Sequence, residues 1–329
     1  MPPRPLVSVI VPAYQAEDTL GAALTGALTQ TYDRVEIVVC NDGSSDATSA
    51  IAHAHALGNS STRHRVVVVD QENRGLAAAR NAAIEASSGE LVTLCDSDDM
   101  LLPSHVGDAV EAFDRRGGGR TFVSSNAWFL SKHGIIPGRR IYTRPAAVPS
   151  EHQRMRILEG NIASIFSTFP RAMWEELGGF SSEMRLMEDY DLWARAIFAG
   201  WTLTWVERPT ACYRLTPGSL SSDSARMAEY DKLLKGRLRE RFGESMTPQE
   251  RDRLDFMLEH DTAAQYIDAA AVELAAGRTA EAARLLGLAA RLSPSDRRLR
   301  LKALALQRLP VTGRVYARRE AQRLSETSR

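Results

Sequence analysis

Acidic side chains stand directly after an apolar run of the chain. Asp96, Asp98 and Asp99 follow Leu91–Cys95, a run whose composition predicts a buried strand. Two carboxylates at positions i and i+2 of an extended segment share a face, so Asp96 and Asp98 can reach one cation. Their oxygens suit hard cations such as Mg²⁺ or Mn²⁺, which keep open positions for phosphate oxygens. Alternatively, Asp99 caps a helix that begins at Leu101.

Two other apolar runs end in the same way. Val35–Cys40 is followed by Asn41-Asp42, and Arg65–Val69 is followed by Asp70. Each polar end alone could form a turn or a helix cap. Because ligands bind outside the carboxyl ends of parallel strands, the three ends together favour a site there.

The elements that must position these residues alternate over the first hundred residues. The expected strands are Leu6–Val11, Val35–Cys40, Arg65–Val69 and Leu91–Cys95. The expected helices lie between them, over residues 20–28, from Ser45 or Asp46 to Gly58, and over 76–87. This alternation indicates an α/β fold with a parallel sheet covered on both faces.

Residues 105–220 are less regular. We expect a helix at about 103–113, a strand over 122–130, a loop over 131–150, a helix over 187–199 and a strand over 202–206. From Ser224 onward the pattern is almost wholly helical, and this shift in composition marks a boundary.

Length and charge exclude several classes of protein. The chain has 329 residues, with 41 Lys and Arg against 41 Asp and Glu. The length predicts two domains, or one large domain with an appendage. The balanced charge argues against electrostatic binding of nucleic acid over the whole protein surface. Three widely spaced cysteines favour a reducing compartment over a disulfide framework or a zinc site. No apolar run is long enough for a membrane span or a signal peptide, so we expect a cytoplasmic protein.

Five blocks of sequence, in order, carry a resemblance to a known family. They read VSVIVPAYQAEDTL (7–20), VVCNDGSSDAT (38–48), NRGLAAARNAAIEASSGELVTLCDSDD (73–99), LGGF (177–180) and EDYDLWARA (188–196). The chain thereby resembles glycosyltransferase family 2, inverting nucleotide-sugar transferases with the GT-A type, Rossmann-like fold. The resemblance implies a nucleotide-sugar-binding half (1–104) and an acceptor-binding half (105–222) of one transferase domain, followed by a helical extension (223–329).

The resemblance also implies the residues that bind the donor. The nucleoside is expected to contact Pro12, Ala13, Tyr14 and the nearby Glu17, and its base to contact Asp42. The ribose and the diphosphate are expected near Arg80, Asp96, Ser97 and Arg214. Asp98 is expected to be the main direct metal ligand, with Asp96 beside it. From the pattern alone Arg80 could be a surface charge, although the Arg-Asn pair in its block argues against this.

An acceptor hydroxyl must lose its proton during attack, so the reaction needs a base. Asp189 matches the family's base position, Glu188 is the runner-up, and we assign Asp191 no role. The helix dipole is expected to stabilise the carboxylate of Asp189, which keeps it deprotonated but makes it a weaker base. Alternatively, Glu188 and Asp189 only cap the first turn.

One position departs from the family. Members often carry a histidine, a ligand of the metal or the diphosphate, shortly after a Tyr-Arg pair. Here Thr216 follows Tyr213-Arg214 at that position. A hydroxyl is a poorer metal ligand than an imidazole, so either the third contact shifts to water or phosphate, or metal dependence is weaker.

The last hundred residues are expected to be helical. Ala263–Leu292 resembles a single tetratricopeptide-type hairpin, which would pack on the catalytic domain or mediate a homodimer. Residues 295–329 hold ten Lys and Arg but three Asp and Glu. This stretch either contacts an anionic membrane surface or forms a solvated helix face.

These features predict an inverting glycosyltransferase assisted by Mg²⁺ or Mn²⁺. The donor is expected to be a UDP-, GDP- or TDP-linked sugar, and the acceptor a glycan or lipid-linked glycan of surface polysaccharide or glycolipid assembly. The alternative is a catalytically degenerate scaffold that binds nucleotide-sugar and uses its helical C-terminus for protein contacts. The intact pairs Asp96/Asp98 and Glu188/Asp189 argue against it.

Overall fold

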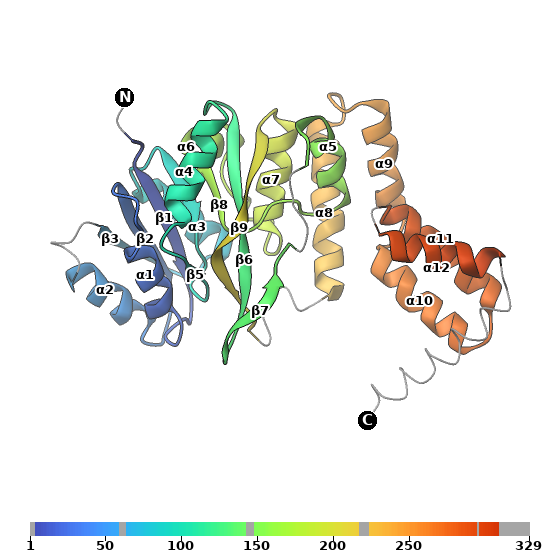
Figure 1. Cartoon of the computed structure of the whole chain (residues 1–329), viewed down its shortest axis with the longest axis horizontal. Helices are drawn as coiled ribbons and strands as arrows, with labels where there is room; N and C mark the ends of the chain where they lie inside the picture. The colour runs from blue at the N-terminus through green and yellow to red at the C-terminus, as the bar shows by residue number, and fades with distance from the viewer. Residues whose placement is uncertain (1–3, 59–63, 143–147, 217–223, 295, 309–329) are drawn as a thin grey trace. The chain divides into compact units, whose positions relative to one another are not determined.

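The computed structural model describes residues 4–58, 64–142, 148–216, 224–294 and 296–308 (Figure 1). The chain divides into two compact units, Met1–Leu234 and Lys235–Arg329. The boundary predicted between residues 222 and 223 lies outside the described residues.

The first unit is built on a nine-stranded mixed sheet. Four parallel strands in the order β3-β2-β1-β4 form one half of it, as predicted. They are β1 (Val7–Ala13), β2 (Val35–Asp42), β3 (Arg65–Gln71) and β4 (Leu91–Leu94). The helices between them also match the prediction, and are α1 (Leu20–Leu28), α2 (Thr48–Gly58) and α3 (Leu76–Ala86).

The other half of the sheet continues in the order β8-β6-β9-β5, with β7 paired to β6. These strands are β5 (Met100–Leu101), β6 (Thr121–Ser131), β7 (Gly134–Arg140), β8 (Ser167–Pro170) and β9 (Thr202–Arg214). Because β8 is antiparallel to both β4 and β6, and β9 is parallel to β6, the long strands β6 and β9 point the same way as β1–β4. We call the edge where these strands end the carboxyl edge.

The predicted loop over residues 131–150 is wrong, since it contains β7. This strand is mostly exposed and contains two glycines and a proline, and its conformation comes from pairing with β6. The remaining helices of this half are α4 (His105–Arg115), α5 (Ser150–Glu159), α6 (Arg171–Leu177) and α7 (Glu188–Phe198).

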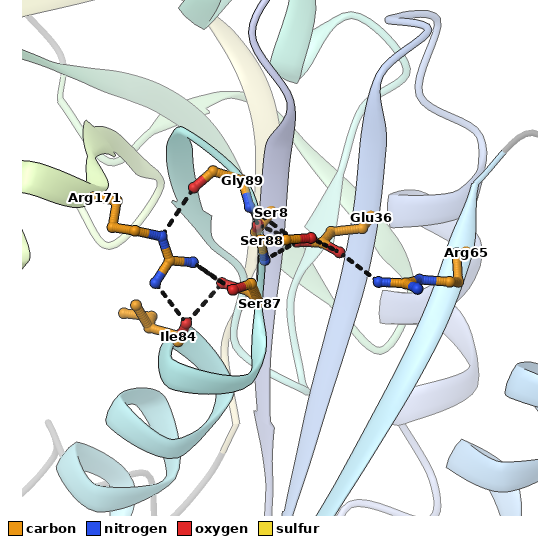
Figure 2. Close-up of polar contacts among 8 residues, drawn as sticks. All are labelled: Ser8, Glu36, Arg65, Ile84, Ser87, Ser88, Gly89 and Arg171. Atoms are coloured by element: carbon orange, nitrogen blue, oxygen red, sulfur yellow. Dashed lines mark hydrogen bonds and ion pairs between the residues drawn. The ribbon is translucent and has the colours of Figure 1, made fainter.

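A buried polar network ties the strands together at the opposite, amino edge of the sheet (Figure 2). Glu36 accepts hydrogen bonds from Ser8 Oγ at 2.7 Å and from the backbone N–H groups of Ser88 and Gly89. Arg171 donates to the carbonyls of Ile84, Ser87 and Gly89 at 2.8–3.1 Å. The turn between α3 and β4 is therefore held from both sides.

The second unit is helical, as predicted. It contains the end of α8 (Ser224–Phe242), followed by α9 (Pro248–Glu259), α10 (Ala263–Ala275), α11 (Thr279–Leu292) and α12 (Arg297–Arg308). The α10–α11 hairpin turns at Gly277, whose φ of 77° favours glycine. Within α12, Leu299 and Leu306 are buried, whereas Leu301 and Leu304 are exposed. No helix in the described ranges combines the length and the apolarity that a membrane span requires.

Candidate functional site

The predicted site residues lie at and around the carboxyl edge. Pro12 and Ala13 end β1 and are buried, and Tyr14, which follows them, is 53% exposed. Ser97 lies partly exposed between Asp96 and Asp98, in the segment that follows β4. The structure thus brings the predicted donor-binding segments to one edge of the sheet.

Asp42 holds the loop that leads into α3. Its Oδ1 accepts hydrogen bonds from Gln71 Nε2 at 2.6 Å and from the N–H of Arg74 at 2.9 Å, and its Oδ2 accepts from the N–H of Gly75 at 2.9 Å. These contacts fix the start of the helix that carries Arg80. Contact of Asp42 with a nucleotide base stays a prediction.

Glu17 holds the start of α2. Its Oε2 accepts from the N–H of Ala47 at 2.9 Å, and its own N–H donates to Asp46 Oδ2 at 3.1 Å. Asp46 Oδ1 also accepts from the N–H of Thr48 at 3.0 Å, which agrees with the predicted cap. Gln15, in the same loop as Glu17, adopts a left-handed backbone conformation with a φ of +50°.

Arg80 is the centre of the site and is not a surface charge. Its side chain is 1% exposed on α3, beneath the ring of Phe180 at 5.5 Å. Nη2 donates to Asp96 Oδ1 at 2.7 Å, and Nη1 donates to Glu188 Oε1. One guanidinium therefore connects a carboxylate that follows β4 with a carboxylate at the start of α7, although 108 residues separate Arg80 from Glu188.

Glu188 and Asp189 begin α7, as predicted. Burial raises the pKa of Glu188 to about 7, although Arg80 opposes the shift. Burial also raises the pKa of Asp189, again against Arg80. The expected dominance of the helix dipole at Asp189 is therefore wrong, because desolvation of the charged form outweighs it. A raised pKa makes Asp189 a stronger base.

Two residues beside Asp189 had no signal in the sequence. Asn161 Nδ2 lies 3.4 Å from Asp189 Oδ2. Burial and then the charge of Asp189 raise the pKa of Tyr142, whose hydroxyl donates to the carbonyl of Ala163 at 3.1 Å. Both residues belong to segments without a periodic pattern of apolar residues, so their position in the fold could not be predicted.

Asp99 is not a helix cap, because Met100–Leu101 is a strand and α4 begins only at His105. Instead Asp99 is buried, and its Oδ1 accepts from the N–H of Arg214 at 2.8 Å. Arg214 Nε in turn donates to the carbonyl of Asp98 at 2.6 Å. The end of β9 is thus fastened to the acidic segment that follows β4.

The oxygen chemistry of this segment fits a hard cation. Burial, and then the neighbouring charge of Asp96, raise the pKa of Asp98, so a bound cation would relieve the repulsion between the two carboxylates. Thr216 Oγ1 lies 3.4 Å from Asp98 Oδ2. The described residues contain no group of three or more His, Cys, Asp or Glu able to hold a metal. Any such ion would take its other ligands from phosphate or water.

Asp191, to which no role was assigned, is structural. Its side chain is buried and pairs with Arg195 at 2.7 Å. Arg195 also donates to the carbonyls of Leu177 and Gly179 at 2.9 and 2.8 Å. The pair therefore fixes the LGGF segment, whose Phe180 lies against Arg80.

Comparison with known proteins gives consistent results. A model of the family described as "Glycosyl transferase family 2" matches residues 8–170. The Succinoglycan biosynthesis protein ExoU of Rhizobium meliloti (strain 1021) is 32% identical over 205 residues, which are 59% of this chain and 57% of that protein. The chain thus spans less than two thirds of the length of this relative.

Two solved structures share the fold. S. aureus TarS 1-349 in complex with UDP-GlcNAc aligns with a TM-score of 0.60 at 16% identity, over 98% of this chain and 92% of TarS. The mannosyltransferase PcManGT from Pyrobaculum calidifontis, in complex with GDP-Man and Mn²⁺, aligns with a TM-score of 0.58 at 18% identity, over 97% and 84% of the two chains. The predicted GT-A type α/β fold with a helical C-terminal region is confirmed.

Proposed function

Residues 8–170 belong to glycosyl transferase family 2, and from this premise we propose that the chain transfers a sugar from a nucleoside-diphosphate donor to an acceptor hydroxyl, with inversion. The observation that carries the proposal is the Arg80 guanidinium, which joins Asp96 to Glu188 within a buried cluster. It couples the donor side of the site to the helix that carries the base. The likeness to structures with bound UDP-GlcNAc and GDP-Man supports a nucleotide-sugar donor.

In this proposal the donor lies over the ends of β1, β2 and β4. Pro12, Ala13, Tyr14 and Asp42 face the nucleoside, and Asp96 and Ser97 lie beside the sugar-phosphate. Asp98, with Asp96, would hold Mg²⁺ or Mn²⁺, and the Mn²⁺ bound by PcManGT supports this. When bound, such an ion acts as a Lewis acid on the leaving diphosphate.

Asp189 removes the proton of the acceptor hydroxyl as that oxygen attacks the anomeric carbon. The bond to the nucleoside diphosphate breaks at the opposite face, which inverts the anomeric configuration. Asn161 beside its Oδ2 keeps the carboxylate oriented. Glu188 remains paired with Arg80, so it positions the start of α7 and does not act as the base.

Similarity to a succinoglycan biosynthesis protein supports polysaccharide assembly as the setting of the reaction. We also propose, from the sequence alone, a cytoplasmic location at the inner face of a membrane. The exposed, basic and apolar face of α12 could touch that membrane, and the helical unit could instead mediate a dimer. Residues 309–329 of the predicted basic stretch lie outside the described part of the chain.

A thermal-shift panel tests the donor site. UDP, GDP, TDP and CDP are each added with and without Mn²⁺ to the wild type, to Asp98→Asn and to the control Asp252→Asn, an exposed residue of α9. A nucleotide at 100 times its Kd should stabilise the fold by ~2.7 kcal/mol. We expect one nucleotide to stabilise the wild type and the control with metal, and Asp98→Asn to lose the shift. If no nucleotide shifts the wild type, the chain lacks a working donor site and the proposal fails.

A further inference from the structure

The β6–β7 hairpin presents charge of a single sign. Residues 121–140 contain three Lys and Arg and no Asp or Glu, in a chain whose net charge is zero. Lys132 and His133 form the turn, and Arg139 and Arg140 end β7, all of them exposed. Ile135, between the two groups of cations, is 48% exposed. The hairpin is therefore both basic and apolar at its surface.

The two arginines are held by aromatic rings. Arg139 lies over Phe129 at 5.5 Å and Arg140 over Trp128 at 5.9 Å. Among the described residues, no carboxylate pairs with either arginine or with Lys132. Since successive side chains of a strand point to opposite faces, the arginines charge both faces of the hairpin. That arrangement fits an extended anionic surface better than a single phosphate group.

The hairpin lies at the carboxyl edge. β6 and β9 end there side by side, because Leu130 pairs with Arg214, and in Figure 1 the hairpin lies at the bottom of the view. Tyr142, two residues after Arg140, lies close enough to Asp189 for that charge to raise its pKa. A surface bound by the hairpin would therefore lie near Asp189, on the side of the site where the acceptor must enter.

We propose that the β6–β7 hairpin seats the carboxyl edge on an anionic lipid bilayer surface. Charge complementarity of Lys132, Arg139 and Arg140 provides the attraction, and Ile135 enters the interface. This inference rests on the proposed function. It assigns the acceptor to the lipid-linked glycans, and the head group of such an acceptor would reach Asp189 at the membrane surface. Lipid binding itself does not depend on catalysis.

Flotation with vesicles of equimolar phosphatidylcholine and phosphatidylglycerol at low salt tests the surface. The variant is Arg139→Gln/Arg140→Gln. The control is Arg115→Gln/Arg116→Gln, which removes equal charge from exposed positions at the other end of β6. At about 1 kcal/mol per cation, we expect binding of the hairpin variant to fall ~30-fold and that of the control to change less than ~3-fold. Wild-type binding should disappear in high salt and with phosphatidylcholine alone.

Several results would overturn the proposal. The hairpin variant could float like the wild type, or the control could lose as much, which would reduce the effect to net charge. Binding could be lost only in Arg297→Gln/Arg300→Gln, which would assign it to α12. Cations on an edge strand also block strand-to-strand aggregation, and that role alone predicts an aggregating variant with unchanged lipid affinity. The nucleotide-dependent thermal shift should persist in the hairpin variant, which separates this test from the test of donor binding.

Discussion

Replacing Arg80 by glutamine should destabilise the first unit strongly, and more so at high pH. The change leaves Glu188, which is 5% exposed, without its cation. Breaking a buried ion pair costs ~3–5 kcal/mol, and about 3 °C per kcal/mol for a unit of this size gives a fall in Tm of ~10 °C or more.

The pH dependence follows from the pKa of Glu188. Burial already raises this pKa to about 7, and loss of Arg80 raises it further. A carboxyl group whose pKa is higher in the folded state than in the unfolded state binds extra protons when folded, so stability decreases as pH rises. The deficit of Arg80→Gln relative to the wild type should therefore grow as pH rises above about 7.

Calorimetry from pH 6 to pH 9 measures this, with Arg65→Gln as the matched control. Arg65 also pairs with a buried glutamate, Glu36, but its side chain is 66% exposed and Glu36 keeps four other hydrogen bonds. The control should lose less than ~3 °C at every pH. Equal losses in the two variants, or a loss in Arg80→Gln that does not grow with pH, would refute the reasoning. Adding Glu188→Gln to Arg80→Gln should recover part of the Tm.

Three further changes give separate tests. Burial favours a high pKa for Glu36, but hydrogen bonds from Ser8 and Ser88 outweigh it and lower the pKa. Glu36→Gln should therefore lower the free energy of unfolding in denaturant by ~2 kcal/mol at pH 7. This difference from the wild type should vanish as pH falls through the pKa of Glu36. Asp189→Asn should lower kcat by a factor of ~10²–10⁴ while calorimetry gives an unchanged donor Kd, and a smaller fall would remove Asp189 as base. Thr216→His should enlarge the Mn²⁺-dependent thermal shift, and an unchanged shift would place residue 216 outside the metal's reach.

The sequence was sufficient where local pattern and structure coincide. β1 to β4 are apolar runs, and three of them end in polar residues, so the strands, the helices between them and the carboxyl edge could all be predicted. The short strands β5 and β8 and the exposed strand β7 could not, because pairing with distant segments determines them. The same limit applies to the site. Nothing in the Ala-rich pattern of α3 reveals that Arg80 is buried, since its partner Glu188 begins another helix far along the chain.

The network of Figure 2 has a consequence for the stage of synthesis at which the protein can fold. Arg171 donates to the carbonyls of Ile84, Ser87 and Gly89 at the end of α3 and in the turn that follows it, and β8 pairs with the edge of β4 that β1 leaves open. A nascent chain of about a hundred residues therefore has the first four strands but lacks the segment that completes them. We expect such a chain to remain sensitive to protease and dependent on chaperones, and the whole first unit to become resistant in one late step of translation, after Arg171 and β8 have emerged from the ribosome.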